Sequence, residues 1–135
     1  MPSYPQTQRA VKQADSVEHS VFCYCYRDAS NYKSWGKLLL AGQASSSDQE
    51  RLINAFDAGE FFIAEQLNIP PLYEELWVLS GGPTTDDHVW HTFYKLRLAT
   101  TDESRLPVFD TVENLVSKAK AVNCWDETLS PHWAL

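Results

Sequence analysis

The stretch Val21-Phe22-Cys23-Tyr24-Cys25-Tyr26-Arg27 decides the fold, because large aromatic residues alternate in it with small residues. A period of two indicates a β-strand, in which successive side chains point to opposite faces of the sheet. Both faces of this strand are apolar, since the aromatic residues share one face and Val21, Cys23 and Cys25 share the other. A strand that is apolar on both faces is typical of a sheet interior. The sequence therefore predicts a central strand over residues 21–27.

Three further strands are predicted along the chain. Lys37 to Gln43, Glu74 to Leu79 and His88 to Ala99 each have the pattern of an extended run. The last two are joined by Gly81 to Asp87, where the glycines and a proline suit a wide hairpin.

Two capping-box patterns predict where helices begin. In Ser47-Asp48-Gln49-Glu50 and in Asp110-Thr111-Val112-Glu113, the first side chain can accept from a first-turn amide while the glutamate reaches back. Gly59 can adopt the left-handed conformation that ends the first helix. The second helix has apolar residues at helical spacing, namely Val112, Leu115, Val116, Ala119 and Val122. Residues 61–71 are expected to form a packed loop, because Ile69-Pro70-Pro71 blocks regular structure.

The order strand, strand, helix, strand, strand, helix predicts the fold class. We expect an α+β two-layer sandwich, with a mainly antiparallel four-stranded sheet and two helices on one face. Residues 1–19 are polar and are expected to be a loosely ordered lead-in. Residues 20–135 are expected to form a single α+β domain, whose apolar C-terminal tail docks on the body through Trp125 and Trp133.

Composition narrows the class of protein. Of the 135 residues, 44% are hydrophobic and 21% are charged. A chain of this length and composition has enough apolar side chains to form one folded core. Apolar runs such as Leu38 to Ala41 are far shorter than the roughly 20 residues of a membrane helix. The polar beginning of the chain does not resemble a secretory signal. Three cysteines, an odd number, indicate reduced thiols, so the expected location is the cytoplasm.

The sequence contains no nucleotide-binding loop and no nucleophile elbow, so no catalytic residue and no cofactor are predicted. The sharpest polar cluster is Asp86-Asp87-His88 followed by His91. If His88 to Ala99 is a strand, its two imidazoles point to opposite faces and cannot share an ion. We therefore predict no metal site and interpret the cluster as polar residues at the end of a loop.

Acidic residues are concentrated in the middle of the chain, which has a net charge of −7 overall. Between Asp48 and Glu75 only Arg51 opposes them. Such a surface repels nucleic-acid phosphates and attracts a basic protein. The predicted partner-binding residues are Asp57, Glu60, Glu65, Glu74 and Glu75. This first hypothesis is a non-enzymatic binding or inhibitor-type module with an acidic, aromatic surface and no nucleic-acid or membrane partner.

The second hypothesis is a small-molecule binding protein or small enzyme with a pocket at the loop between residues 27 and 35. That loop combines a cation, a carboxylate, an amide, a phenol and an indole, the mixture expected in a ligand site. The predicted ligand-binding residues are Arg27, Asp28, Asn31, Tyr32 and Trp35. The same segment is also consistent with an ordinary surface connection.

A homodimer is also expected, formed either by edge-strand pairing or by packing of the aromatic sheet face, because helices on one face of a sheet leave the other face exposed. Its predicted dimer face consists of Phe22, Tyr24, Tyr26, Trp90 and Tyr94. The alternative is that the apolar tail covers that face within one chain.

Three segments resemble small bacterial proteins of unassigned role, some of which are carried on mobile integron gene cassettes. The resembling segments are Tyr26 to Lys33, Leu38 to Leu40 and Gly59 to Leu67, within residues 20–95. The resemblance implies a bacterial, cytoplasmic accessory protein. It assigns no catalytic or binding residue.

Overall fold

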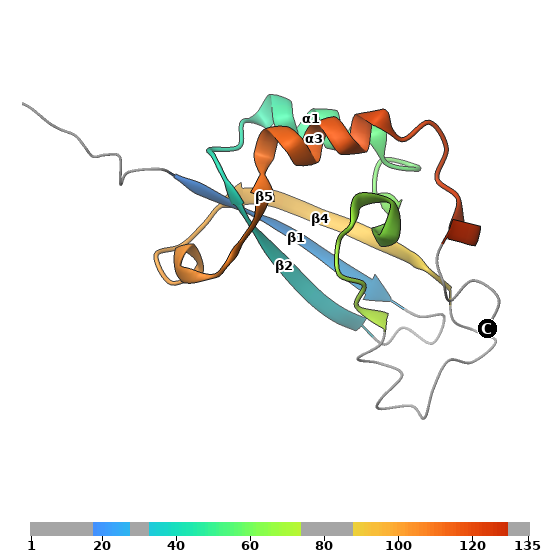
Figure 1. The fold of residues 1–135 in the computed structure, drawn as a ribbon, viewed down its shortest axis with the longest axis horizontal. Coiled ribbons are helices and arrows are strands. Elements are labelled where there is room, and N and C mark those ends of the chain that lie inside the picture. The colour runs from blue at the N-terminus through green and yellow to red at the C-terminus, as the bar shows by residue number, and fades with distance from the viewer. Residues whose placement is uncertain (1–17, 28–32, 74–87, 130–135) are drawn as a thin grey trace, which may run out of the picture.

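One five-stranded sheet with strand order β3-β4-β1-β2-β5 carries the fold, and two helices, α1 and α3, run along one side of it (Figure 1). The structure is a computed structural model of the chain and describes residues 18–27, 33–73 and 88–129. The strands are β1 (His19–Arg27), β2 (Lys33–Ala41), β3 (Phe61–Ile63), β4 (Trp90–Leu98) and β5 (Val108–Thr111). The helices are α1 (Ser46–Ala55) and α3 (Val112–Ala121), with 3-10 turns η2 (Ala64–Leu67), η3 (Glu103–Arg105) and η4 (Glu127–Leu129).

The α+β class is confirmed, and β1 is the central strand, as the alternation of aromatic and small residues predicts. The sheet differs from the prediction in having five strands, because β5 pairs with β2 in the parallel direction. β5 has only four residues and leads directly into α3, so its sequence carries little strand signal. The predicted strand at Glu74 to Leu79 and the predicted hairpin at Gly81 to Asp87 lie outside the described residues.

The prediction of a packed loop over residues 61–71 is wrong in its first half. Phe61–Ile63 pairs with β4, and Ala64–Leu67 forms η2. Both elements bury their apolar side chains, with Phe62 and Ile63 fully buried. The two prolines follow η2 and do not interrupt it.

Both helix starts differ slightly from the predicted capping boxes. α1 is capped by Ser45, whose hydroxyl accepts from the Asp48 amide at 3.1 Å while the Asp48 carboxylate accepts from the Ser45 amide at 2.9 Å. The box therefore lies two residues before the predicted one. α3 is capped by Thr111, which accepts from the Asn114 amide at 3.0 Å. Asp110 instead lies one residue before the cap, and its carboxylate accepts from the Thr111 amide at 2.7 Å.

The aromatic face of β1 forms the floor of the core beneath the helices. Phe22, Tyr24 and Tyr26 have exposed fractions of 0, 2 and 0%, and the Phe22 ring packs against Phe56 and Phe93. The phenol groups are bonded inside the core, with the Tyr24 hydroxyl donating to the Pro70 carbonyl at 2.8 Å. Three of the five predicted dimer-face residues are thus buried, because the helices cover the aromatic side of the sheet. The homodimer itself stays a prediction.

The C-terminal segment docks on the helical side through Trp125. Its indole N–H donates to the Ala55 carbonyl at 2.8 Å, and its ring packs against Phe56. The indole of Trp90 donates to the Glu127 carboxylate at 2.9 Å and holds η4 in place. The tail therefore packs on the body, but on the side of the helices. Trp133 lies outside the described residues.

Both histidines of the predicted polar cluster are used structurally. The rings of His88 and His91 both pack against Tyr26, so the prediction that they face opposite sides is wrong. The reason is that β4 begins at Trp90, which leaves His88 before the strand. His91 is fully buried, and its Nε2 accepts from the Leu72 amide at 2.9 Å. Asp86 and Asp87 lie outside the described residues.

The core approaches β2 so closely at Gly36 that no side chain fits there. A Cβ at this position would lie 2.9 Å from Leu72 Cδ2 and 2.9 Å from Tyr24 Cε1. Both neighbours are buried, so neither can move without disturbing the core. Gly36 thus allows Leu72 and Tyr24 to meet across the strand.

We expect Gly36→Ala to lower the free energy of unfolding by about 1–3 kcal/mol, because it overpacks the core. An ordinary strand glycine would gain stability from alanine, so the sign of the change is informative. Urea denaturation measures it. In a double mutant with Leu72→Ala, the combined loss should be smaller than the sum of the two single losses. An additive pair would contradict the close approach.

His91 predicts how stability depends on pH. Burial lowers the pKa of His91 to about 4, so the unfolded chain takes up a proton below about pH 6.5 that the folded chain refuses. Stability is therefore lost as the pH falls from about 6.5 to 4, by about 3 kcal/mol. His91→Gln, which keeps an acceptor for the Leu72 amide, should lack this loss. Urea denaturation of both proteins across this pH range measures the difference; parallel curves would contradict the assignment.

Candidate functional site

The face of the sheet opposite the helices carries an exposed aromatic pair. We call this surface the open face and define it by Arg27, Lys33, Trp35, Lys37, Tyr94, Lys95 and Arg97, together with the small residues Cys23 and Cys25. Trp35 is 56% exposed and Tyr94 is 60% exposed. Their rings meet at right angles, with centroids 5.4 Å apart and an interplanar angle of 79°. Exposed apolar side chains that lie together, unlike single ones, indicate a candidate interaction surface.

The ring pair depends on two local features of β1 and β4. Trp35 lies directly opposite Cys25 in the β1–β2 pairing, and the thiol side chains of β1 are too small to separate the rings. In the β1–β4 pairing, Cys23 faces Lys95 and Tyr24 faces Phe93, which leaves Tyr94 as an extra residue in a β-bulge. Tyr94 and Lys95 are consequently both exposed.

Cations surround the aromatic pair. Cys23 is flanked by Lys37 on β2 and by Lys95 on β4, because both are its register partners. The Lys95 ammonium lies 5.5 Å from the centre of the Tyr94 ring. At the other end of the strands, Arg27 pairs directly with Lys33. Like charges directly opposite each other destabilise a sheet, so this pair lowers the stability of the fold.

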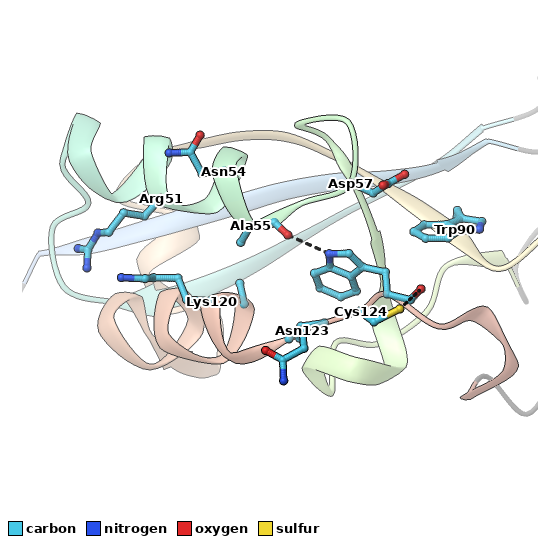
Figure 2. Close-up of a pocket in the computed structure, with 11 residues that line it drawn as sticks. Arg51, Asn54, Ala55, Asp57, Trp90, Lys120, Asn123 and Cys124 are labelled. Atoms are coloured by element: carbon cyan, nitrogen blue, oxygen red, sulfur yellow. Dashed lines mark hydrogen bonds between the residues drawn. The ribbon is translucent and has the colours of Figure 1, made fainter.

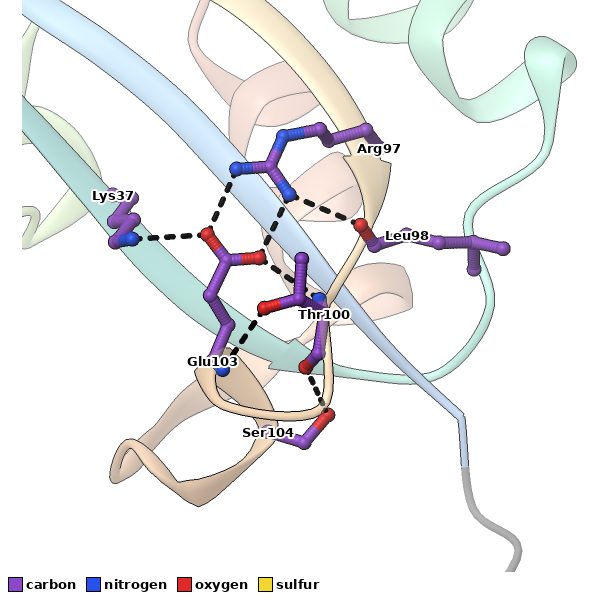
Figure 3. A network of polar contacts seen from close by, with 6 residues as sticks. All are labelled: Lys37, Arg97, Leu98, Thr100, Glu103 and Ser104. Atoms are coloured by element: carbon purple, nitrogen blue, oxygen red, sulfur yellow. Dashed lines mark hydrogen bonds and ion pairs between the residues drawn. The ribbon is translucent and has the colours of Figure 1, made fainter.

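A single carboxylate, Glu103, fixes two of these cations (Figure 3). It accepts from both Nη atoms of Arg97 at 2.8 Å and from Lys37 Nζ at 2.9 Å. The Thr100 amide also donates to it, at 2.9 Å. These bonds, led by the Arg97 guanidinium, hold the pKa of Glu103 far below its usual range. The carboxylate is therefore ionised at all physiological pH values and anchors the η3 turn to the sheet.

The other three cations of the open face have no such partner. Within the described residues, no carboxylate lies within ion-pair distance of Arg27, Lys33 or Lys95. Of these three, only Lys95 lines the cavity of about 420 Å³ beside the aromatic pair, whose other lining residues are Cys23, Trp35, Gly36, Lys37, Tyr94 and Arg97. The open face thus combines stacking surfaces with five cations, of which Glu103 pairs with two, Lys37 and Arg97.

A second hollow lies between the C-terminal ends of α1 and α3 (Figure 2). It has a volume of about 830 Å³, and the bonded Trp125 is among the residues that line it. Arg51 and Lys120 lie at one end of it, but Arg51 is already paired with Asp48. Asp57 and Trp90 lie at the other end. This groove is polar at its rim, but its tryptophans serve the docking of the C-terminal segment.

The predicted ligand loop is only partly where the sequence placed it. Trp35 belongs to β2 and not to a loop, since β2 begins at Lys33 instead of Lys37. Arg27 ends β1, directly opposite Lys33. Both residues belong to the open face, while Asp28, Asn31 and Tyr32 lie outside the described residues.

The predicted acidic surface is assembled only in part. Asp57 and Glu60 are exposed in the turn after α1. The Glu65 carboxylate instead accepts a bond from the Tyr73 hydroxyl, so it faces the protein. Glu74 and Glu75 lie outside the described residues. Among the predicted dimer-face residues, Trp90 is half-buried by its bond to Glu127, and Tyr94 belongs to the open face.

Sequence reasoning missed the role of Lys37, Lys95 and Arg97. A signal existed for Lys37, which shares the period of two with Trp35 and Lys33. For Lys95 and Arg97 the bulge at Tyr94 shifts the alternation, and a bulge leaves no clear mark in the sequence.

None of the comparisons, with protein-family models, with curated proteins and with solved structures, finds a match for this chain. The resemblance to integron-cassette proteins therefore stays a prediction. In the part of the chain that the structure describes, no helix is long and apolar enough to cross a bilayer. The same residues include no group of three or more histidine, cysteine or acidic side chains placed to hold a metal ion.

A substitution of Glu103 tests whether its bonds to Arg97 and Lys37 stabilise the folded protein. We expect Glu103→Gln to lower the free energy of unfolding at pH 7 by about 1–3 kcal/mol, because charge-assisted bonds are lost. Since the folded pKa is depressed, the stabilisation is present above about pH 4.5 and is lost as the pH falls further. The difference between the two proteins should thus shrink below pH 4.5. Denaturation at a series of pH values measures it, with the exposed Glu113→Gln as the control.

Proposed function

We propose that this protein is a non-enzymatic binding module that holds an anionic partner on the open face of its sheet. The observation that carries the proposal is the exposed Trp35–Tyr94 pair, surrounded by Arg27, Lys33 and Lys95 without a described carboxylate partner. Aromatic rings and cations together are typical of surfaces that bind by stacking and charge.

The proposal keeps the class of function that the sequence predicts but changes the surface. The exposed aromatic residues lie with cations and not with acids. The acids Asp48, Glu50, Glu65, Glu113, Asp126 and Glu127 belong to the helices and turns of the covering layer and to the C-terminal segment. The net charge of −7 therefore describes the whole chain but not the open face.

The open face is poorly suited to a two-fold dimer. A two-fold contact brings a patch against its own copy. Here it would place the Arg27–Lys33 pair and Lys95 of one chain near those of the other, where like charges repel. This argument favours a different kind of molecule as the occupant of the face.

Nuclear magnetic resonance titration tests the proposal. Polyglutamate, heparin and oligothymidylate serve as anionic probes and polylysine as the cationic probe. We expect at least one anionic probe to shift the amide signals of β1, β2 and β4 around Trp35 and Tyr94. Shifts caused only by polylysine, on α1 and the turn at Asp57, would instead support the acidic-surface hypothesis.

Charge reversal supplies the matched control. Lys95→Glu should weaken binding of the anionic probe about ten-fold at low salt, because an attraction becomes a repulsion. Lys120→Glu makes the same change of charge on α3 and should leave the affinity nearly unchanged. Equal losses in both variants would mean that only the net charge matters, which contradicts a site on the open face.

A further inference from the structure

We infer that the anionic partner of the open face is a single-stranded nucleic acid, with bases stacked on Trp35 and Tyr94 and phosphates at Arg27, Lys33 and Lys95. This inference rests on the proposed function and names its partner. Three features carry it: the ring pair, the order of the cations along the strands, and the excess of cations over carboxylates among the described residues of this face.

The ring pair is the feature that distinguishes a nucleic acid from an acidic peptide. Trp35 and Tyr94 are more than half exposed, and their planes differ by 79°. Each ring therefore presents a π-face in a different direction. Every base has a π-face, and base–aromatic stacking contributes to binding without regard to sequence. An acidic peptide would satisfy the cations but would leave both rings without a stacking partner.

The cations lie on either side of the rings along the strands. The Arg27–Lys33 pair comes first, the Cys25–Trp35 pair follows, and Cys23 then faces Lys37 and Lys95. From Arg27 to Cys23 the strand runs about 13 Å at about 3.3 Å per residue. In a single strand, each base branches from a sugar that has a phosphate on either side of it along the backbone. The open face therefore offers phosphate sites at both ends of a short stacking platform.

Net charge does not exclude this partner, contrary to the expectation from the sequence. The acids of α1, α3 and the C-terminal segment lie beyond the core, and packed layers are about 10 Å apart. At physiological ionic strength the Debye length is about 8 Å, so their repulsion is largely screened at the open face. On the open face itself, Glu103 is the acid in contact with the cations, and it is neutralised by Arg97 and Lys37.

Fluorescence anisotropy of labelled oligothymidylate and oligouridylate of increasing length tests the inference. The two series distinguish DNA from RNA, and tight binding of either supports the proposal. We expect Trp35→Ala and Tyr94→Ala each to weaken binding about five-fold or more, since each removes one stacking surface. Both side chains are exposed, so both variants should fold, which circular dichroism checks.

A salt series supplies an independent measurement. Three cations without a described carboxylate partner predict a slope of log K against log salt of about −2 for a single strand. Lys95→Gln should move that slope toward zero by about 0.7. Lys120→Gln, on the helical side, should change neither the slope nor the affinity.

Several results would overturn the inference. Equal binding of a duplex of the same length would exclude stacking on free bases, and a lack of oligonucleotide binding would exclude a nucleic acid altogether. If polyglutamate bound in its place, the proposed function would stand with an acidic protein segment as the partner. If the unliganded chain self-associated and Trp35→Ala abolished this, a second copy would be the occupant of the face.

Discussion

The two-sided burial of β1 is the constraint on which both the core and the open face depend. Phe22, Tyr24 and Tyr26 must lie beneath the helices, and a slip of one residue would move all three rings to the opposite face. This register places the small side chains of Cys23 and Cys25 on the open face. The packing of the core therefore determines that small side chains lie beneath the exposed rings of Trp35 and Tyr94.

The open face is completed by features that do not favour stability by themselves. The bulge at Tyr94 leaves one residue of β4 unpaired but turns both Tyr94 and Lys95 outward. Opposing Arg27 to Lys33 adds a like-charge pair to the sheet. The carboxylate of Glu103 forms ion pairs with Lys37 and Arg97, and it does not pair with Lys95. A sheet shaped only for stability would avoid these arrangements, and their concentration around one ring pair points to binding.

The elements that the sequence predicted well are those with strong local periodicity. The alternation from Val21 to Arg27 identified the central strand, and helical spacing identified α3. Two strands were missed: β3, which was assigned to a loop because of the prolines that follow it, and β5, which has only four residues and whose pairing with β2 is determined by tertiary contacts. The cap of α1 was misplaced because Ser45 and Ser47 both satisfy a serine–acid spacing of three, and only the structure shows which of them is used.

The candidate site was harder to predict because its charges are sorted by face and not by position along the chain. The segment from Asp48 to Glu75 is strongly acidic in sequence. By contrast, the residues of β1, β2 and β4 that point away from the helices include five cations. The two results are compatible, since five cations share the open face, while most of the described acids belong to the helices, turns and C-terminal segment of the covering layer. An anionic partner of the kind proposed would be attracted to the cations of the open face, while the acids of the covering layer would disfavour its approach from the other side. Orientation by the field and stacking on the rings would thus both follow from one sheet, whose aromatic side is covered by the helices while Trp35 and Tyr94 stay exposed on the other side.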